Sequence, residues 1–383
     1  MAKYLTSDET IRKIRTQKEL DEYIAFRKSD DRWYSPNISE ITAVGIENMP
    51  LNISEKLEEY HLPETESVME TIRNYGIFLK FPHDGKEEYI PIRYTAFPGL
   101  CKVSGTNCRA VTNYTPRAKD RVLPLQTKVE WITTGCRLRD IPCKILLRDE
   151  KVSSVVTRRY AILPQWELLE SLTTRLDTEF QGEYEFDEAV ISHDYSCFSY
   201  RIEDEEMIDS VIGFLQNCHI NCNSVKCGVC MATSDIGLSR AYAYLYIEYD
   251  GIRIQLSDVA DVIHDFGNTV DTFNNSMVNI GAAFHENEDR IEELGNTPIS
   301  DISNCVKNIL EAHPLFPAKT ADTVLQGIAA RTGNVGTAAD CFLSFFEMAD
   351  LTRRAGESNL RLYLELMQRV SKMLWINYEA FDK

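Results

Sequence analysis

The feature that most constrains the fold is a long periodic row of apolar residues in the last third of the chain. The steps along this row alternate between three and four residues, which places its members on one face of an α-helix. The row extends over more than five heptads with one polar interruption, and its members are Leu256, Val259, Ile263, Phe266, Val270, Phe273, Met277, Ile280, Phe284, Asn287, Ile291 and Leu294. The pattern predicts a long helix with a continuous apolar seam.

The residues after this row predict a second helix and therefore a helical hairpin. Gly295 is expected to end the long helix, and Thr297 and Pro298 suit the N-cap and the first position of the next one. The seam of residues 256–294 can pack on later helices of the same chain, or it can join two chains into a homo-oligomer. Two internal glycines, each costing up to about 1 kcal/mol relative to alanine, favour packing within a globular body.

The centre of the chain is rich in predicted strands. The run "AVISHDYSCFSYRI" alternates in polarity, and "RAYAYLYIEYDGIRIQL" repeats the alternation on both sides of an Asp-Gly pair. Alternation with a period of two is typical of half-buried strands, and Asp-Gly favours a two-residue hairpin turn. Before these runs, Pro164 and the leucines after it predict an amphipathic helix.

Together the patterns predict an α+β protein in three parts. The first is an N-terminal α/β extension, residues 1–95. The second is a central α+β domain with mixed or antiparallel strands and helices, residues 96–256. The third is all-helical, residues 257–383, and contains the heptad-patterned hairpin. A length of 383 residues suits two or three such substructures.

Composition limits the class of protein. With 44% hydrophobic and 26% charged residues, the chain has the composition of an ordinary soluble globular protein. No apolar run approaches the roughly 20 residues that span a bilayer, and the N-terminal sequence does not have the pattern of a signal peptide. We therefore expect no membrane partner and a cytoplasmic location, where the eleven cysteines remain thiols.

Four cysteines within thirteen residues raise the question of a metal site. These are Cys218, Cys222, Cys227 and Cys230. Four thiolates suit a tetrahedral zinc ion, but the last two are the only pair with the short spacing of a zinc knuckle. The alternating pattern around them predicts a strand, which would point Cys227 and Cys230 to opposite faces of a sheet. A zinc site and buried thiols both remain open, and the strand pattern favours thiols without metal.

Catalytic motifs are sparse in this sequence. It contains no glycine-rich phosphate loop, no nucleophile elbow and no two-histidine metalloprotease helix. His193 and Asp194 suggest a general base, but neighbours on a strand face opposite sides. A non-enzymatic role without a cofactor is favoured, although an enzyme is not excluded.

One basic segment stands out in an acidic chain. The whole chain carries a net charge of −18, whereas Lys102 to Arg159 contains thirteen Lys and Arg against five Asp and Glu, a balance of +8. Cations interleaved with aromatic residues suit a single strand of nucleic acid. The predicted contacts are Arg117, Lys119, Arg121, Arg137, Arg139, Arg148, Arg158, Arg159 and Tyr160. The alternative is that these charges are spread over several solvated faces.

Four segments, taken in order, resemble the phage/plasmid-like protein family of unknown function. They are "AFPGLCKVSGTN", "ILLRDEKVSSVVTRRYAILPQWELLESL", "AVISHDYSCFSYRI" and "CMATSDIGLSRAYAYLYI". The positions that match are Leu100, Cys101, Gly105, Leu146, Leu147, Arg148, Val155, Arg159, Tyr160, Ser234, Asp235 and Gly237. The chain departs from the family at Arg158, where an acidic residue is commoner, and at the Asp-Gly turn after Tyr249. The resemblance implies residence on a mobile element, in the cytoplasm of a bacterial host, within a family that has no established reaction.

Two functions therefore follow as expectations. The first is a non-enzymatic accessory protein of a phage or plasmid that contacts single-stranded nucleic acid through the basic segment. The second is an acidic protein-binding or assembly factor that uses the heptad-patterned helices to contact a host or phage protein.

Overall fold

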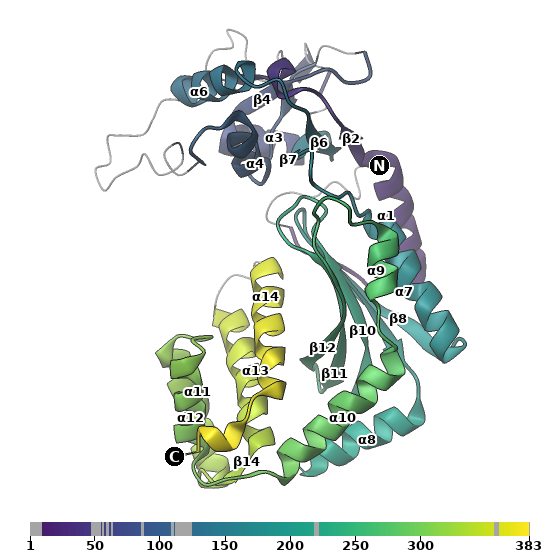
Figure 1. Ribbon diagram of the computed structural model, residues 1–383, viewed down its shortest axis with the longest axis vertical. Helices are drawn as coiled ribbons and strands as arrows, with labels where there is room; N and C mark the ends of the chain where they lie inside the picture. The colour runs from purple at the N-terminus through teal and green to yellow at the C-terminus, as the bar shows by residue number, and fades with distance from the viewer. Residues whose placement is uncertain are drawn as a thin grey trace.

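The computed structural model of the protein shows two lobes stacked along the long axis of the molecule (Figure 1). It describes residues 10–46, 55, 57–58, 61–62, 64–85, 88–108, 111, 125–217, 222–355 and 360–382. Both lobes combine helices with antiparallel sheets, so the predicted α+β class is confirmed. Among the helices of these ranges, none is long and apolar enough to cross a membrane.

A six-stranded antiparallel sheet forms the centre of the lower lobe in Figure 1. Its strands, in spatial order, are β1 (Arg12–Ile14), β8 (Tyr184–Ile191), β9 (Ser196–Ile202), β10 (Val225–Thr233), β11 (Ala241–Tyr249) and β12 (Ile252–Val262). The turn between β11 and β12 is the predicted Asp-Gly turn. Asp250 and Gly251 both have positive φ, as a type I′ hairpin requires.

The run that we predicted as one alternating strand consists of two strands. Its first residues end β8 and its last seven form β9, and the two strands pair as a hairpin. The Ser192 backbone N–H donates to the carbonyl of Tyr195 at 2.8 Å, and its hydroxyl donates to Asp194 Oδ1 at 2.6 Å. His193 and Asp194 therefore lie in a turn, and the prediction that they face opposite sides of a strand is wrong.

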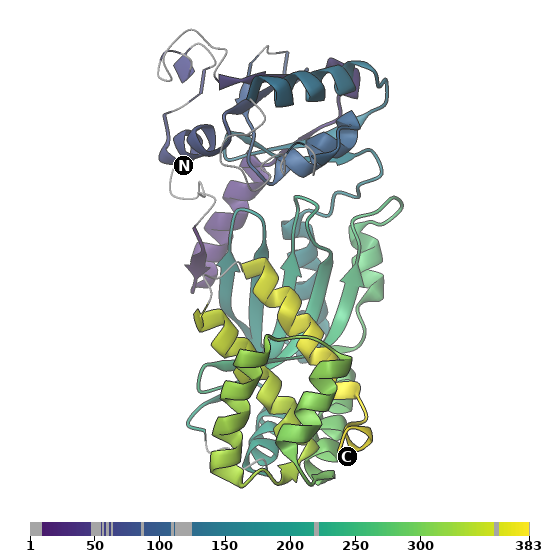
Figure 2. The same cartoon turned by 90° about the vertical axis from the view of Figure 1, so that its left-hand side faces the viewer.

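Different helices cover the two faces of the sheet. Cys227, Val229 and Met231 face a core shared with α7 (Gln165–Phe180), α8 (Glu205–Asn217) and α10 (Ile280–Asn296). Cys230 and Tyr244 face the other way, toward α14 (Leu360–Ser371), with α13 (Ala338–Ala355) beside it. Figure 2 shows α14, in yellow, lying across this second face. The lobe is completed by α9 (Val270–Ser276), α11 (Ile302–Ala312), α12 (Ala318–Thr332), β13 (Pro298–Ile299) and β14 (Gly336–Thr337).

The long heptad helix predicted for residues 256–294 is wrong. Its first positions belong to β12, and the later ones to the separate helices α9 and α10. The side chains of Thr269 and Asn279 cap these two helices, because each accepts a hydrogen bond from a backbone N–H in the first turn. The second helix predicted from Thr297 begins later, after the cap residue Asp301.

The apolar row is nevertheless buried for most of its length, inside a single chain. Phe273, Phe284 and Leu294 lie in the core of the lower lobe, whereas Ile263 and Phe266 are exposed in the loop between β12 and α9. A buried row split over a strand and two helices presents no continuous seam. Residues 256–294 therefore do not form the continuous apolar surface through which we predicted a homo-oligomer or a protein partner.

Among the described residues, the upper lobe contains two three-stranded sheets, three α-helices and the short 3-10 helix η2 (Ile38–Glu40). One sheet joins β2 (Arg32–Tyr34), β6 (Cys143–Arg148) and β7 (Lys151–Thr157), and the other joins β3 (Thr42–Gly45), β4 (Ile77–Lys80) and β5 (Ile90–Pro91). The α-helices are α3 (Glu66–Tyr75), α4 (Ala96–Ser104) and α6 (Leu125–Arg137).

The two main cores do not follow the predicted domain boundaries. The upper core includes Ile38 and Val155, so the boundary after residue 95 lies inside it. The lower core includes Leu20 from α1 (Gln17–Asp30) and resumes at Ala161, while the boundary after residue 256 falls within β12. The upper lobe is thus an insertion between α1 and the rest of the lower lobe.

Candidate functional site

Charged side chains from both lobes meet at a buried junction, formed by the end of α1, the β6–β7 turn and the loop after β10. Arg148 lies at its centre. Its Nε donates to Asp31 Oδ1 at 2.9 Å, and its Nη2 donates to Asp235 Oδ2 at 2.7 Å. All three side chains are almost fully buried. Arg148 therefore connects the upper lobe to α1 and to the sheet of the lower lobe.

The β6–β7 turn forms the second part of the junction. Asp149 and Glu150 both have positive φ, a conformation that is uncommon for residues other than glycine. Asp149 forms ion pairs with Arg27 and Arg93, and its backbone N–H donates to Asp30 Oδ2 at 2.8 Å. These contacts hold the turn in its strained conformation.

Burial and pairing shift the two central carboxyl groups in opposite directions. Burial acts to raise the pKa of Asp149, but the charges of Arg27 and Arg93 outweigh it and lower the pKa to about 2. For Asp235, burial outweighs the attraction of Arg148 and raises the pKa to about 6. A raised folded-state pKa means that Asp235 contributes stability below its unfolded pKa near 4, and that this contribution is lost as the pH rises through about 6.

Two of the segments quoted for the family resemblance meet at this junction. Tyr160 is buried there, with its hydroxyl donating to the carbonyl of Asp235 at 2.9 Å and its ring stacked on His264. Gly237, with φ of 81°, packs against the same ring, and a Cβ at this position would lie 3.2 Å from a ring carbon of Tyr160. Arg148 belongs to the same segment as Tyr160. Both segments therefore contribute side chains to the junction.

The structure divides the nine predicted nucleic-acid contacts into three groups. Three lie outside the described residues, namely Arg117, Lys119 and Arg121. Two are buried in the junction, so their predicted role as surface contacts is wrong, namely Arg148 and Tyr160. Four are exposed, namely Arg137, Arg139, Arg158 and Arg159. The basic sequence segment is therefore not one basic surface, because part of its charge is neutralised inside the protein.

The cysteine-rich segment contributes to β10. Cys227 and Cys230 face opposite sides of the sheet, as the strand pattern predicts. Cys230 Sγ lies 2.8 Å from Cys197 Sγ on the neighbouring strand. Cys218 lies outside the described residues, and within them no three His, Cys, Asp or Glu side chains gather as metal ligands would.

We expect the purified, reduced protein to carry no stoichiometric zinc. Because Cys227 and Cys230 point to opposite faces of one strand, they cannot ligate the same tetrahedral ion. Elemental analysis of the full chain measures the zinc content, with Cys222→Ser as the matched variant. One zinc per chain in the parent, lost in this variant, would contradict the assignment of these residues as buried thiols.

A cavity of about 650 Å³ lies between the second face of the sheet and the C-terminal helices. Cys197, Tyr244 and Gln255 line it from β9, β11 and β12. From the helices it is lined by Phe346, Tyr363, Leu364 and Met367. The volume falls within the range of about 300–1,000 Å³ that is typical of small-molecule sites.

Charged residues at one side of the cavity neutralise one another. The Arg253 guanidinium lies over the Tyr246 ring, 4.0 Å from its centroid, and donates to Ser199 Oγ at 2.7 Å and to Glu248 Oε2 at 3.0 Å. Lys226 donates to Asp187 at 2.8 Å. Four cations and four carboxylates line the cavity in all, namely Lys13, Arg15, Lys226, Arg253, Asp187, Glu188, Glu248 and Asp350. The lining as a whole therefore carries no net charge.

Gln255 is the polar group that this network does not satisfy. Its side chain is 1% exposed, and neither amide atom has a hydrogen-bond partner among the described residues. Gln255 pairs with Tyr246 in register, so both side chains lie on the second face. A buried polar group without a partner costs about 1–3 kcal/mol. Sequence reasoning missed Gln255 because a single glutamine on a strand belongs to no motif, and alternation assigns it to the polar face.

Two titratable groups of the cavity lining, Cys197 and Tyr244, have raised pKa values. Hydrogen bonding to Cys230 and burial raise the pKa of the Cys197 thiol. Burial raises the pKa of the Tyr244 hydroxyl. Both groups therefore stay protonated at neutral pH, and neither is an activated nucleophile.

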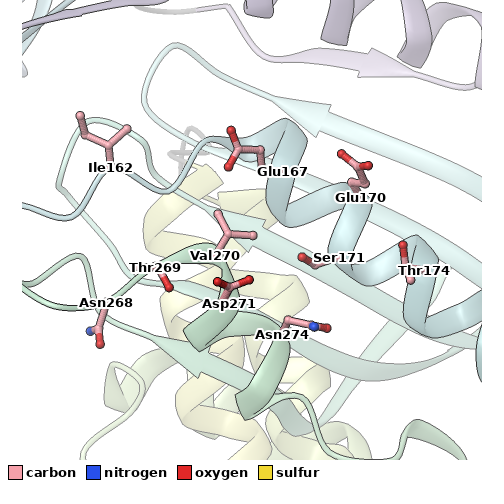
Figure 3. A pocket seen from close by; sticks show the side chains of 10 residues that line it. All are labelled: Ile162, Glu167, Glu170, Ser171, Thr174, Asn268, Thr269, Val270, Asp271 and Asn274. Carbon is pink, nitrogen blue, oxygen red and sulfur yellow. The ribbon is translucent and has the colours of Figure 1, made fainter.

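A second hollow of about 560 Å³ lies between α7 and α9 (Figure 3). Glu167, Glu170 and Asp271 line it together with hydroxyl and amide side chains. The three carboxylates do not converge on one point (Figure 3), in agreement with the lack of a metal-ligand cluster in the described parts of the chain. The hollow therefore offers no assembled site.

The cavity beside α14 is accordingly the best candidate site. Its geometry is the basis for a proposed function. No protein family, no curated protein and no solved structure matches this chain.

Proposed function

We propose that this protein is a non-enzymatic binding protein that holds a small neutral molecule in the cavity between the sheet and α14. The observation that carries the proposal is Gln255, which lines a cavity of about 650 Å³ and whose buried amide has no partner among the described residues. The balanced charges of the lining and the protonated state of Cys197 support binding of a neutral molecule without a reaction.

Thermal unfolding in the presence of a panel of neutral small molecules tests this proposal. A ligand at 100 times its Kd stabilises the folded state by about 2.7 kcal/mol, which raises the Tm by several degrees. Leu364→Trp fills the cavity, because Leu364 lines it from α14. Leu362→Trp is the matched control, because Leu362 is exposed on the same helix and does not line the cavity. A ligand that stabilised both variants equally would place binding elsewhere and contradict the proposal.

Single-stranded nucleic acid is a second candidate ligand, favoured by the placement of the four exposed arginines. Cys143 at the start of β6 pairs with Thr157 at the end of β7. Arg137 and Arg139 come shortly before this pair in sequence, and Arg158 and Arg159 directly after it. Arg158 and Arg159 therefore lie at this end of the β6–β7 hairpin, and the segment that contains Arg137 and Arg139 leads into it.

An exposed aromatic ring accompanies these cations. Arg159, whose side chain is 69% exposed, pairs with Asp265 at 3.4 Å. Phe266, which follows Asp265 in the chain, is 78% exposed. Phe266 therefore takes the stacking role that the sequence predicted for Tyr160, since aromatic faces stack on unpaired bases. On this proposal the protein remains a non-enzymatic accessory protein of a phage or plasmid.

We expect a short single-stranded DNA to bind at about 50 mM salt and to lose affinity steeply as the salt concentration rises. Replacing Arg137, Arg139, Arg158 and Arg159 together with glutamine should weaken binding and flatten the dependence on salt. Phe266→Ala should weaken binding with the same salt dependence, because stacking is not ionic. Fluorescence anisotropy measures both effects. Equal binding by the parent and by the fourfold variant would contradict this second candidate.

A further inference from the structure

The Gln255 carboxamide restricts the chemistry of the ligand, and this inference rests on the proposed cavity site. A glutamine amide presents a carbonyl acceptor and an N–H donor side by side in one plane. Two parallel hydrogen bonds can satisfy both atoms at once when the partner has the same arrangement in reverse. A carbonyl beside a ring N–H, the lactam edge of a nitrogen heterocycle, has this arrangement.

The walls of the cavity favour a flat molecule. Tyr244 lines it from the sheet, and Phe346 and Tyr363 line it from α13 and α14. Aromatic side chains pack on planar rings through offset or edge contacts. Leu364 and Met367 add apolar contacts from α14.

The charges argue against an anionic or cationic ligand. Arg253 and Lys226 are already paired with Asp187 and Glu248, and Arg253 also stacks on Tyr246. A charged ligand that bound to Arg253 or to Lys226 would have to displace one of these pairs. A neutral ligand leaves the network intact and needs only the amide of Gln255.

We propose that the cavity binds a planar, uncharged nitrogen heterocycle through a lactam edge that pairs with the Gln255 carboxamide. The class includes pyrimidine and purine bases with a ring carbonyl next to an N–H. The ring would lie between the β11–β12 side of the sheet and α14, with its edge toward Gln255.

Isothermal titration of the full chain with uracil and with hypoxanthine tests this inference. A uracil that carries methyl groups on both ring nitrogens is the control, because it keeps the carbonyls and the flat ring but has no N–H to donate. We expect saturable binding of at least one of the two bases and no detectable binding of the methylated compound.

Gln255→Leu should reduce the affinity for the base about tenfold or more, because the paired amide is lost. This variant should melt no lower than the parent, since it replaces an unpaired buried amide with an apolar group of similar size. Gln326→Leu, on the exposed face of α12, is the matched control and should bind like the parent. Undiminished binding by Gln255→Leu, or equal binding of the methylated compound, would overturn the inference.

Failure of the inference is distinguishable from failure of the proposed function. If both bases fail to bind while another neutral molecule stabilises the parent but not Leu364→Trp, the cavity is a binding site and the lactam class is wrong. If no neutral molecule discriminates between Leu364→Trp and Leu362→Trp, the cavity site itself is wrong, and water serves as the partner of Gln255.

Discussion

Phe273→Asp is expected to lower the free energy of unfolding by about 4 kcal/mol or more, because it removes a buried ring and introduces a carboxylate without a partner. Phe273 is fully buried in α9, within the core that joins α9 to the sheet. Chemical denaturation followed by circular dichroism measures the change.

Phe266→Asp is the matched control for this prediction. Both phenylalanines belong to the same apolar row in the sequence, but Phe266 is 78% exposed in a loop. Its replacement should change the free energy of unfolding by no more than about 0.5 kcal/mol. If both variants lost the same free energy of unfolding, Phe266 would be as buried as Phe273. That result would support the continuous heptad helix and contradict the division into β12, α9 and α10.

Arg148→Leu is the second change for which we expect a large effect, a loss of about 3–5 kcal/mol at neutral pH. The substitution leaves Asp31 and Asp235 buried without their main cation, and breaking a buried pair by removing one partner costs this much. The loss should be smaller at acidic pH, because Asp235 can then protonate. Its pKa is already raised to about 6 by burial, and the loss of Arg148 removes a charge that lowers it.

Denaturation curves at acidic and at neutral pH measure this difference. Arg159→Leu is the control, because its exposed ion pair with Asp265 contributes no more than about 1 kcal/mol. If Arg148→Leu and Arg159→Leu had the same small effect on the free energy of unfolding, Arg148 would not hold the lobes together. That result would support its predicted role as a surface contact.

The sequence predicted the elements of the sheet better than the helices after it. Alternation and the Asp-Gly pair identified β11 and β12 because both signals are local. The heptad pattern misled because spacings of three and four also arise where a bulged strand is followed by two short helices. Strand β12 has such irregularities opposite Tyr244 and Tyr246, which bring Leu256 and Val259 to the same core.

The functional site was less accessible to sequence reasoning than the fold. Arg148 and Tyr160 sit in a basic segment, but their partners, Asp31 and Asp235, lie far away in the sequence and neutralise or bury them. Gln255 gives no signal until the sheet and α14 enclose it. Membership of the phage/plasmid-like family stays a prediction, and so does residence on a mobile element.

The most direct measurement of the central claim is a crystal structure of the full chain grown with saturating uracil or hypoxanthine. We predict density for the ring between the sheet and α14, with its lactam edge within hydrogen-bond distance of both amide atoms of Gln255. Density for the base elsewhere on the protein, with only water beside Gln255, would contradict the account.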